Sequence, residues 1–306
     1  MPVTLALEPY DRTQPLLDGR VPLPNVSPVV VASGPRHERM LLDHAYDAAE
    51  LSMSSYILAR ARGAPFVAIP VFPRRLFSPS CVYVRHGITR PAELHGGRIG
   101  VYSLQFTMSV VARGDLHHYL GVPMDAVIWV RAGREIIAHA SRLPVEERPG
   151  VDLWSLLADG RLDAVISPDV PAAFEEGRVL RLFPAFEAVD RELYQSTRVF
   201  PIMHTVAIMR AAVVRRPSLP RELYDAFAHA KAMAWRALRQ PHATGLVWGR
   251  AALEAQERLL GDAFPYGLGD ANRRALALLM RYQVEQGFLD RAEDIDDLFV
   301  EVEPPV

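Results

Sequence analysis

Short apolar runs alternate with amphipathic segments through residues 5–183, and this alternation predicts an α/β sheet with crossover helices. The predicted strands are Leu5–Leu7, Pro28–Ala32, Ala48–Leu51, Phe66–Val71, Cys81–Arg85, Arg98–Val101, Ala126–Val130, Ala164–Ile166 and Val179–Phe183. The predicted helices between them are Glu38–His44, Ser54–Arg62, Thr107–Leu120 and Asp152–Leu157. A second series of strands and helices begins at Gly96-Gly97, so the pattern favours two lobes.

The pattern changes after residue 200, where one apolar run precedes a region of helical periodicity. Residues 206–209 are apolar and lie between Pro201 and Arg210, which is typical of a strand buried on both faces. The predicted helices that follow are Glu222–Leu238, Arg250–Leu260, Asn272–Gln286 and Glu293–Phe299. We expect one lobe to be discontinuous and a ligand to bind between the lobes, near the carboxyl ends of strands.

His204 stands at the entrance of that buried strand, in the segment FPIMHTVAIMR at residues 200–210. His204 and Thr205 are the polar residues at this entrance that can exchange or share a proton, and Thr205 is predicted to contact the substrate. A titratable ring against apolar walls is a common place for a shifted pKa, which makes His204 a candidate catalytic residue. The alternative is a core histidine that is satisfied by a backbone carbonyl.

Composition narrows the classes of partner. The chain has 306 residues, half of them hydrophobic, and a net charge of −2 without a basic block, so we expect no nucleic-acid partner. No apolar run approaches the roughly 20 residues that cross a bilayer, so we expect no membrane association. The first residues read as a strand rather than a secretory leader, which predicts a cytoplasmic protein.

Two scarce residue types narrow the chemistry. Cys81 is the only cysteine, which excludes an internal disulfide and multi-cysteine metal sites. Lys231 is the only lysine and lies in a predicted amphipathic helix, so we interpret it as a surface residue rather than a Schiff-base lysine. The chain has no dinucleotide or phosphate-binding glycine motif. We therefore expect no cofactor and no metal, with a divalent ion on histidine and carboxylate ligands as the remaining alternative.

Two serine- and threonine-containing turns are candidate carboxylate sites. Ser52, Ser54 and Ser55 join a predicted strand to a helix, and Ser103 and Thr107 occupy the same position in the second series. Hydroxyls beside the free N–H groups of a helix N-terminus bind anions, and the two turns would face each other across the cleft. Simple helix capping is the alternative at each turn.

Four further residues are candidates because they follow predicted strands. Arg12 and Arg85 are predicted to bind substrate carboxylates through their guanidinium groups; the alternative is a solvated surface arginine. Asp169 is predicted either to cap the next helix or to orient His204 or a substrate hydroxyl. His86 is predicted either to line the cleft or to lie on an exposed loop.

Several longer stretches carry a family resemblance. They are YDR at Tyr10–Arg12, AAELSMSSYILAR at Ala48–Arg60, PFVAIPVFPRRLF at Pro65–Phe77, RIGVYSLQFTMSVVARG at Arg98–Gly114, FPIMHTVAIMR at Phe200–Arg210 and FPYGLGDANRRAL at Phe264–Leu276. In these stretches the chain resembles the 4,5-dihydroxyphthalate decarboxylase family, whose members look like type II periplasmic binding proteins without a leader. The resemblance covers nearly the full length.

The resemblance implies a two-lobed α/β fold of the type II periplasmic-binding-protein kind, with a cleft between the lobes and a helical C-terminal region. It places lobe one at residues 1–84 plus 206–306, lobe two at 97–200, and the hinges at 85–96 and 201–205. The chain departs from the family pattern at His86, in the segment Phe77–Ser80 and at Val110-Val111. We expect these positions to border the cleft and to alter the choice of substrate.

The activity that the resemblance implies is cofactor-independent decarboxylation of a hydroxylated aromatic acid, as in aromatic compound degradation and phthalate catabolism. Protonation of the ring would be assigned to His204, with Asp169 or His86 on the phenol and the serine and arginine sites as anchors. The alternative is a non-catalytic solute-binding or sensing protein for a small aromatic carboxylate. A homo-oligomer is left open.

Overall fold

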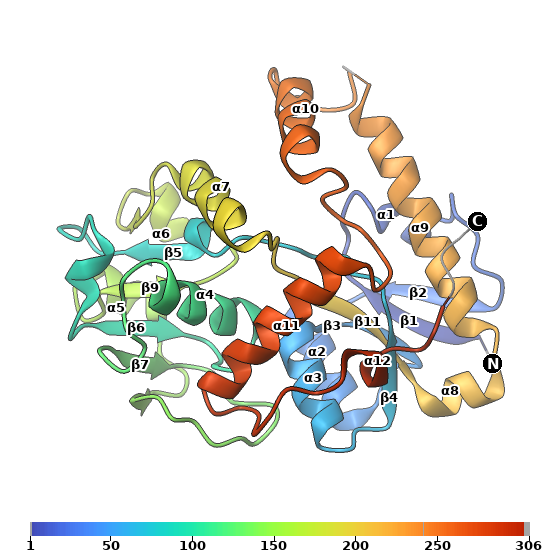
Figure 1. Cartoon of the computed structure of the whole chain (residues 1–306), viewed down its shortest axis with the longest axis horizontal. Coiled ribbons are helices and arrows are strands. Elements are labelled where there is room, and N and C mark those ends of the chain that lie inside the picture. The colour runs from blue at the N-terminus through green and yellow to red at the C-terminus, as the bar shows by residue number, and fades with distance from the viewer. Residues whose placement is uncertain (1, 241, 303–306) are drawn as a thin grey trace.

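A computed structural model describes residues 2–240 and 242–302, and two β-sheets with flanking helices form its framework (Figure 1). The first sheet has the order β2-β1-β3-β11-β4, and β11 runs antiparallel to both of its neighbours. Its strands are β1 (Val3–Leu7), β2 (Val26–Val30), β3 (Ala48–Ser52), β4 (Phe66–Ile69) and β11 (His204–Met209). Every residue of β3 and β4 is buried, as the apolar runs predict.

The second sheet has the order β10-β5-β9-β6-β7-β8. Its strands are β5 (Val82–Val84), β6 (Arg98–Val101), β7 (Ile128–Arg131), β8 (Val145–Glu147), β9 (Ala164–Ile166) and β10 (Leu180–Arg181). The neighbours β9, β6, β7 and β8 are parallel, while β5 is antiparallel to β9. The predicted alternation of strands and helices is therefore confirmed in both halves.

Helices cover the sheets and extend from the first lobe. They are α1 (Gln14–Leu17), α2 (Ser33–Asp43), α3 (Met53–Ala61), α4 (Thr107–His118), α5 (Leu153–Ala158), α6 (Ala172–Glu175), α7 (Phe186–Thr197), α8 (Arg210–Arg215), α9 (Leu219–Leu238), α10 (Gly249–Leu260), α11 (Asp270–Glu285) and α12 (Ile295–Leu298). Among the described residues, no helix combines the length and the apolar character needed to span a membrane. Helix α10 projects from the body and buries none of its residues (Figure 1).

The predicted lobe boundaries are wrong at both crossings between the sheets. Residues 82–84 form β5 of the second sheet, so lobe one does not extend to residue 84, and residues 85–96 connect two strands of the same sheet. His204 and Thr205 belong to β11 rather than to a hinge. The crossing segments instead pair with each other: Arg75 and Ile202 form an antiparallel bridge, and the rings of Phe77 and Phe200 stack 4.7 Å apart.

Helix α11 connects the two lobes, because it packs against both α3 and α4. Gly114 on α4 allows the ring of Tyr282 to lie directly against that helix; a Cβ atom there would overlap the ring. Gln283 donates from Nε2 to Oγ of Ser54 at 2.9 Å, which attaches α11 to the start of α3. The C-terminal region therefore braces both lobes, and its assignment to lobe one alone is too narrow.

Candidate active site

A cavity of about 210 Å³ lies between the two sheets, where the ends of β3, β6, β9 and β11 converge. Strand β11 begins at this edge because it runs antiparallel to β3, with His204 opposite Ser52. This is the predicted position for a ligand in an α/β fold. The cavity is lined by Ser33, Gly34, His37, Ser52, Arg74, Tyr102, Phe106, Thr107, Met108, Ser109, Ile166, Ser167, Pro168, Asp169, Met203 and His204.

The cavity combines apolar walls with a few polar groups. Phe106, Met108, Ile166 and Met203 supply apolar surface, and the imidazole of His204 adds a titratable group. Sites for drug-sized ligands occupy about 300–1,000 Å³, so this smaller space suits a single ring better than a coenzyme.

His204 is held by a buried carboxylate. Its Nδ1 lies 2.5 Å from Oε1 of Glu50, a residue of β3 with no exposed surface. Among the described residues, the other ring nitrogen, Nε2, has no hydrogen-bond partner. The alternative of a core histidine satisfied by a backbone carbonyl is therefore wrong. An ionised carboxylate on Nδ1 fixes the proton there and leaves the lone pair of Nε2 for a bound molecule.

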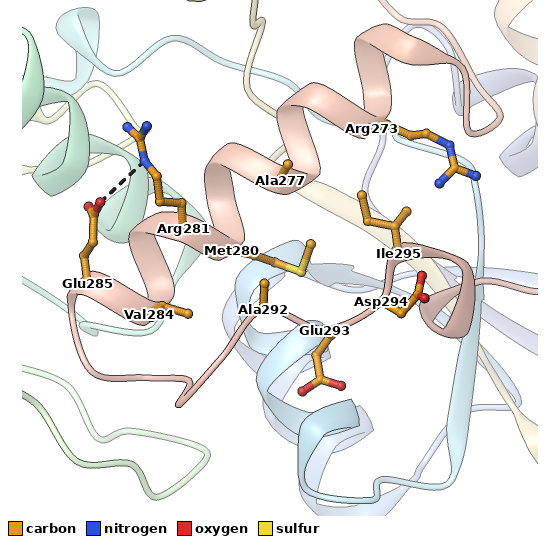
Figure 2. A pocket seen from close by; sticks show the side chains of 10 residues that line it. All are labelled: Arg273, Ala277, Met280, Arg281, Val284, Glu285, Ala292, Glu293, Asp294 and Ile295. Atoms are coloured by element: carbon orange, nitrogen blue, oxygen red, sulfur yellow. Dashed lines mark ion pairs between the residues drawn. The ribbon is translucent and has the colours of Figure 1, made fainter.

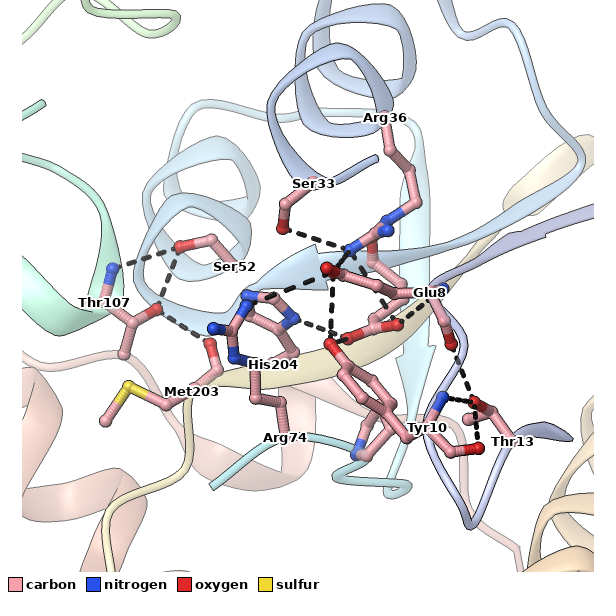
Figure 3. Close-up of polar contacts among 12 residues, drawn as sticks. Glu8, Tyr10, Thr13, Ser33, Arg36, Ser52, Arg74, Thr107, Met203 and His204 are labelled. Carbon is pink, nitrogen blue, oxygen red and sulfur yellow. Dashed lines mark hydrogen bonds and ion pairs between the residues drawn. The ribbon is translucent and has the colours of Figure 1, made fainter. Parts of the chain in front are cut away.

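Glu50 is itself held by donors on three sides. Tyr10 donates its hydroxyl proton to Oε1 at 2.9 Å, and the backbone N–H of Glu8 donates to Oε2 at 3.3 Å. Arg36, which is fully buried, lies 3.8 Å from Oε2 and donates to Oε2 of Glu8 at 3.2 Å (Figure 3). This network keeps the carboxylate in one orientation toward His204.

The pKa values in the network follow from its charges. Burial raises the pKa of Glu50, but the hydrogen bond and charge of His204 and the charge of Arg36 outweigh it and lower the pKa to about 2. Burial lowers the pKa of His204 below 6.5, since the opposing effect of Glu50 is smaller. At neutral pH the pair is therefore an ionised carboxylate and a neutral imidazole. Burial and the charge of Glu50 raise the pKa of Tyr10, so its hydroxyl remains a donor.

Arg74 is the arginine that lines the cavity. It follows β4 and crosses toward the second lobe, where its Nη2 lies 3.9 Å from Oδ1 of Asp169. Its Nη1 lies 4.0 Å from Oε2 of Glu8, so both contacts are long ion pairs without tight hydrogen bonds. Burial lowers the pKa of Arg74, but the acidic groups around it, Tyr10, Glu8, Asp169 and Glu50, raise it overall. A substrate carboxylate could bind this cation by displacing Asp169.

The two predicted serine and threonine turns lie opposite each other, as expected. They are in direct contact rather than separated by the cleft. Oγ of Ser52 and Oγ1 of Thr107 lie 2.9 Å apart, and the N–H of Thr107 donates to Ser52 Oγ at 3.2 Å. Thr107 also donates to the carbonyl of Met203 at 2.9 Å. These hydroxyls join the lobes within the cavity lining. The N–H groups of Met108 and Ser109, in the first turn of α4, have no partner among the described residues.

Three of the predicted serines do not reach the cavity. Ser54 and Ser55 are fully buried, with Ser54 bonded to Gln283 on α11. Ser103 donates to Oε2 of Glu135 at 2.7 Å, and the N–H of Leu104 donates to the other oxygen at 2.6 Å. The second turn is thus an anion site, but the protein's own Glu135 fills it.

The predictions for Arg12, Arg85 and His86 are wrong in placement, because all three lie outside the cavity lining. Arg12 donates to the carbonyl of Pro73 and stacks on aromatic rings. Arg85 donates from Nε to Oδ1 of Asp163 at 2.9 Å. His86 is exposed, with Nε2 3.0 Å from the carbonyl of Gly177.

Asp169 lines the cavity, but 87% of its side chain is exposed, and its carboxylate contacts Arg74 rather than His204. It does not cap α6, whose N-cap is Pro171. Thr205 points to the other face of β11 and donates to the carbonyl of Ile69 at 3.3 Å. The predicted contact of Thr205 with substrate is therefore wrong.

The departures from the family pattern also lie away from the cavity. His86 is on an exposed loop, Ser78 donates to buried Asp115 at 2.6 Å, and Val110 and Val111 are buried in α4. The expectation that these positions alter the substrate finds no contact to support it.

Sequence reasoning missed Glu50, Arg74, Tyr10 and His37. Glu50 was visible as a lone acidic residue in the apolar run AAELS, where an unpaired charge would be costly. Arg74 stands directly beside Arg75, and only the structure separates them: Arg75 turns inward to the carbonyl of Phe200 at 2.8 Å.

Glu8, Glu50 and His204 bring three potential metal-ligand atoms within 4.8 Å of one another. The donors around them already serve other partners, since Glu50 accepts from Tyr10 and pairs with His204 at hydrogen-bond distance. Arg36 and Arg74 supply two positive charges beside the two carboxylates. A divalent cation would have to displace this compensated network, so the residues fit proton exchange better than metal binding.

A larger hollow of about 570 Å³ lies between α11 and residues 292–295 (Figure 2). Both of its arginines pair locally: Arg281 contacts Glu285 at 3.4 Å, and Arg273 pairs with Asp296. None of the network around His204 reaches it. We therefore place the site in the smaller cavity.

Comparison with known proteins agrees with the fold. The periplasmic aliphatic sulphonate binding protein SsuA from Escherichia coli superposes with a TM-score of 0.61 at 15% identity, over 100% of this chain and 94% of that one. The predicted two-lobed periplasmic-binding-protein-like fold is thereby confirmed. No protein-family model matches the chain.

Sequence relatives identify the family. A 4,5-dihydroxyphthalate decarboxylase from Comamonas testosteroni is 37% identical over 287 residues, which covers 88% of this chain and 87% of that protein. A protein of the same name from Pseudomonas putida is 38% identical over 189 residues, with coverage of 57% and 73%. The chain belongs to the 4,5-dihydroxyphthalate decarboxylase family.

Proposed function

We propose that the chain decarboxylates a hydroxylated aromatic dicarboxylic acid, with 4,5-dihydroxyphthalate as the substrate. One observation carries this proposal: Glu50 and His204 form a buried pair. The imidazole of His204 lines an interlobe cavity that Arg74 also lines. Membership of the family and the names of the two relatives support the choice of substrate.

Loss of carbon dioxide from a ring leaves an electron pair that the ring must accept. A hydroxyl para to the departing carboxylate makes this possible, because its deprotonation increases the electron density on the carbon that bears the carboxylate. That carbon is then protonated and carbon dioxide leaves. Such a reaction needs a base for the hydroxyl and cations or N–H donors for the carboxylates.

The geometry favours His204 as the base, in place of the acid role expected from the sequence. A neutral imidazole whose Nδ1 proton is held by Glu50 accepts a proton at Nε2, and Glu50 stabilises the resulting imidazolium. His204 takes the hydroxyl proton and returns it to the phenolate oxygen of the product. The ring carbon gains its proton from solvent, so each turnover consumes one proton and releases one carbon dioxide.

Arg74 and the start of α4 would hold the substrate carboxylates. Arg74 offers a guanidinium with only long contacts, and the first turn of α4 offers the N–H groups of Met108 and Ser109. The partial positive charge of a helix N-terminus adds to this attraction. Asp169 would leave Arg74 when the substrate carboxylate arrives.

The function is tested by incubating the purified chain with phthalate, 4-hydroxyphthalate and 4,5-dihydroxyphthalate, while released carbon dioxide and the products are measured. We expect turnover only where a hydroxyl is para to a carboxylate. Stoichiometric binding without product across the series would favour the alternative of a solute-binding or sensing protein, which the likeness to SsuA keeps open as a second candidate. Loss of turnover on chelation, restored by a divalent ion, would instead favour a metal-dependent lyase.

The pH dependence of kcat/KM reports the role of His204. Burial lowers its pKa below 6.5, so the free protein holds the active neutral form above that pKa. As pH falls through the pKa the imidazole becomes protonated, and we expect kcat/KM to fall about tenfold per pH unit. A kcat/KM that rises toward low pH would instead indicate that His204 acts as the acid.

Arg74→Gln tests the carboxylate anchor. Because the guanidinium faces the cavity, we expect KM to rise about tenfold or more, a loss of 1.4 kcal/mol or above in substrate binding. Removal of this positive charge also raises the pKa of His204, since Arg74 lowers it, so the acid limb of the profile moves to higher pH. Arg85→Gln is the matched control, because Arg85 is paired with Asp163 outside the cavity. Equal effects of both substitutions on KM would remove Arg74 from the site.

A further inference from the structure

A second histidine lines the cavity and has no part in the mechanism so far. His37 lies on α2, is 3% exposed, and presents its ring edge-on to that of His204, with centroids 5.1 Å apart at 83°. The centroid of its ring also lies 6.0 Å from that of Phe106, in an edge-on arrangement. Two buried imidazoles therefore line the same cavity, and their hydrogen-bond partners differ.

The hydrogen bonds of His37 define its tautomer. The backbone N–H of Ser52 donates to Nε2 of His37 at 3.2 Å. A backbone N–H can only donate, so Nε2 must be the unprotonated nitrogen and the ring proton must lie on Nδ1. Among the described residues, no acceptor bonds to this Nδ1–H. His37 therefore brings a donor to the cavity lining, whereas His204 brings an acceptor.

His37 keeps this form at neutral pH. Burial lowers its pKa well below 6.5, and the charges of Arg36 and Arg74, together with that of His204 whenever it is protonated, act in the same direction. Protonation would also break the bond from Ser52, because Nε2 would lose its lone pair. A neutral imidazole of lowered pKa is an effective donor to a developing oxyanion, since it does not itself take the proton.

We propose that His37 donates from Nδ1 to the ring hydroxyl next to the one that His204 deprotonates, so that the two imidazoles together select adjacent hydroxyls. This inference rests on the proposed function. The adjacent hydroxyl accepts the His37 proton in this hydrogen bond and donates its own proton to the phenolate that forms beside it, so His37 acts on the phenolate through that hydroxyl. No bond to carbon changes in this contact. His37 acts by hydrogen bonding alone.

The kinetic test compares two substrates and two substitutions. In His37→Phe, which removes the donor, we expect kcat/KM for 4,5-dihydroxyphthalate to fall about 100-fold. For 4-hydroxyphthalate, which lacks the adjacent hydroxyl, the fall is less than about fivefold, so the preference between the substrates largely disappears. His37→Asn keeps an N–H donor near the position of Nδ1 and recovers part of the preference. An equal loss for both substrates would overturn the proposal.

A second measurement does not need turnover. Histidine ¹⁵N–¹H spectra of the full chain, with His37→Asn used for assignment, should show His37 as the neutral Nδ1–H tautomer from pH 7.5 to 5.5. A proton on Nε2, or a charged ring at pH 7, would overturn the inference whatever the activity. If the wild-type chain releases no carbon dioxide, the proposed function fails. In that case calorimetry of wild type and His37→Asn gives the ratio of the Kd values for the two phthalates. This ratio tests whether His37 contacts the adjacent hydroxyl. A ratio that His37→Asn leaves unchanged overturns the proposal.

Exposed His95 provides the matched control, since its Nε2 lies 2.8 Å from the carbonyl of Gly121, away from the cavity lining. His95→Phe should leave the preference between the two phthalates unchanged. If His37→Phe lowers the yield of folded protein, the comparison of His37→Asn with wild type still decides the question. A change of preference in His95→Phe equal to that in His37→Phe would count against a specific role for His37.

Discussion

Replacing His204 with glutamine should lower kcat by about a thousandfold and leave the Kd for 4,5-dihydroxyphthalate within about threefold. The reason is that the proposed mechanism assigns the proton exchange to His204 and the binding of the carboxylates to Arg74 and the start of α4. Tyr10 still donates to Glu50, so the buried carboxylate keeps a partner. Carbon dioxide release at saturating substrate gives kcat, and calorimetry gives Kd.

The control for this experiment is His95→Gln, which changes an exposed histidine outside the cavity lining and should leave both quantities unchanged. If His204→Gln kept more than about a tenth of the wild-type kcat, His204 would not be the base. A parallel loss of binding would instead assign His204 to substrate binding.

Glu50→Gln should have the second large effect, in both turnover and stability. Glutamine has nearly the same shape but no charge, so it neither fixes the Nδ1 proton of His204 nor stabilises the imidazolium. We expect kcat to fall by about 10³–10⁴-fold, as when the carboxylate of a triad is neutralised. The same change removes one of the two carboxylates beside fully buried Arg36 and leaves only Glu8. Because a buried charge is then less well compensated, the free energy of unfolding should fall by about 3–5 kcal/mol.

Urea unfolding measures the stability change, and its pH dependence has a defined sign. The pKa of Glu50 is about 2 in the folded chain against an ordinary value of 4.5. Its ionised form therefore stabilises the fold above about pH 4.5, and this contribution is lost as pH falls toward 2. Glu50→Gln should flatten that part of the profile.

Glu8→Gln is the matched control, because the Glu8 side chain is 27% exposed and does not contact His204. It should retain most of kcat and lose less stability than Glu50→Gln. A Glu50→Gln protein with wild-type stability and turnover would show that the network is not needed for either.

The periodicity of the sequence predicted most of the sheet strands but not every helix. The apolar run at 206–209 predicted β11, since a short apolar run bounded by Pro201 and Arg210 is typical of a strand buried on both faces. Helix α7 was missed because Phe186–Thr197 mixes acidic residues with few apolar ones and buries only Leu193. Helix α2 begins at Ser33 rather than Glu38, because Pro35 is tolerated in a first turn.

The sequence predicted some of the residues that line the candidate cavity. His204 was identified from its position beside an apolar strand, and the Ser52 and Thr107 turns do meet between the lobes. Arg12 and Arg85 were chosen because they follow strands, but sequence position does not show where a long side chain points. The acidic partner of His204 lies 154 residues away in the chain, and no local pattern connects them.

The sequence by itself determined the fold class, the buried strands and the family, because these depend on local periodicity and on stretches of shared residues. The tertiary structure decided which charges face the cavity and which are consumed elsewhere. It placed Glu135 in the Ser103 turn, turned Arg75 inward beside Arg74, and brought His37 and Glu50 to His204. The physical reason is that a side chain's chemistry depends on its hydrogen-bond partners and burial, and these are supplied by strands and helices distant in the chain.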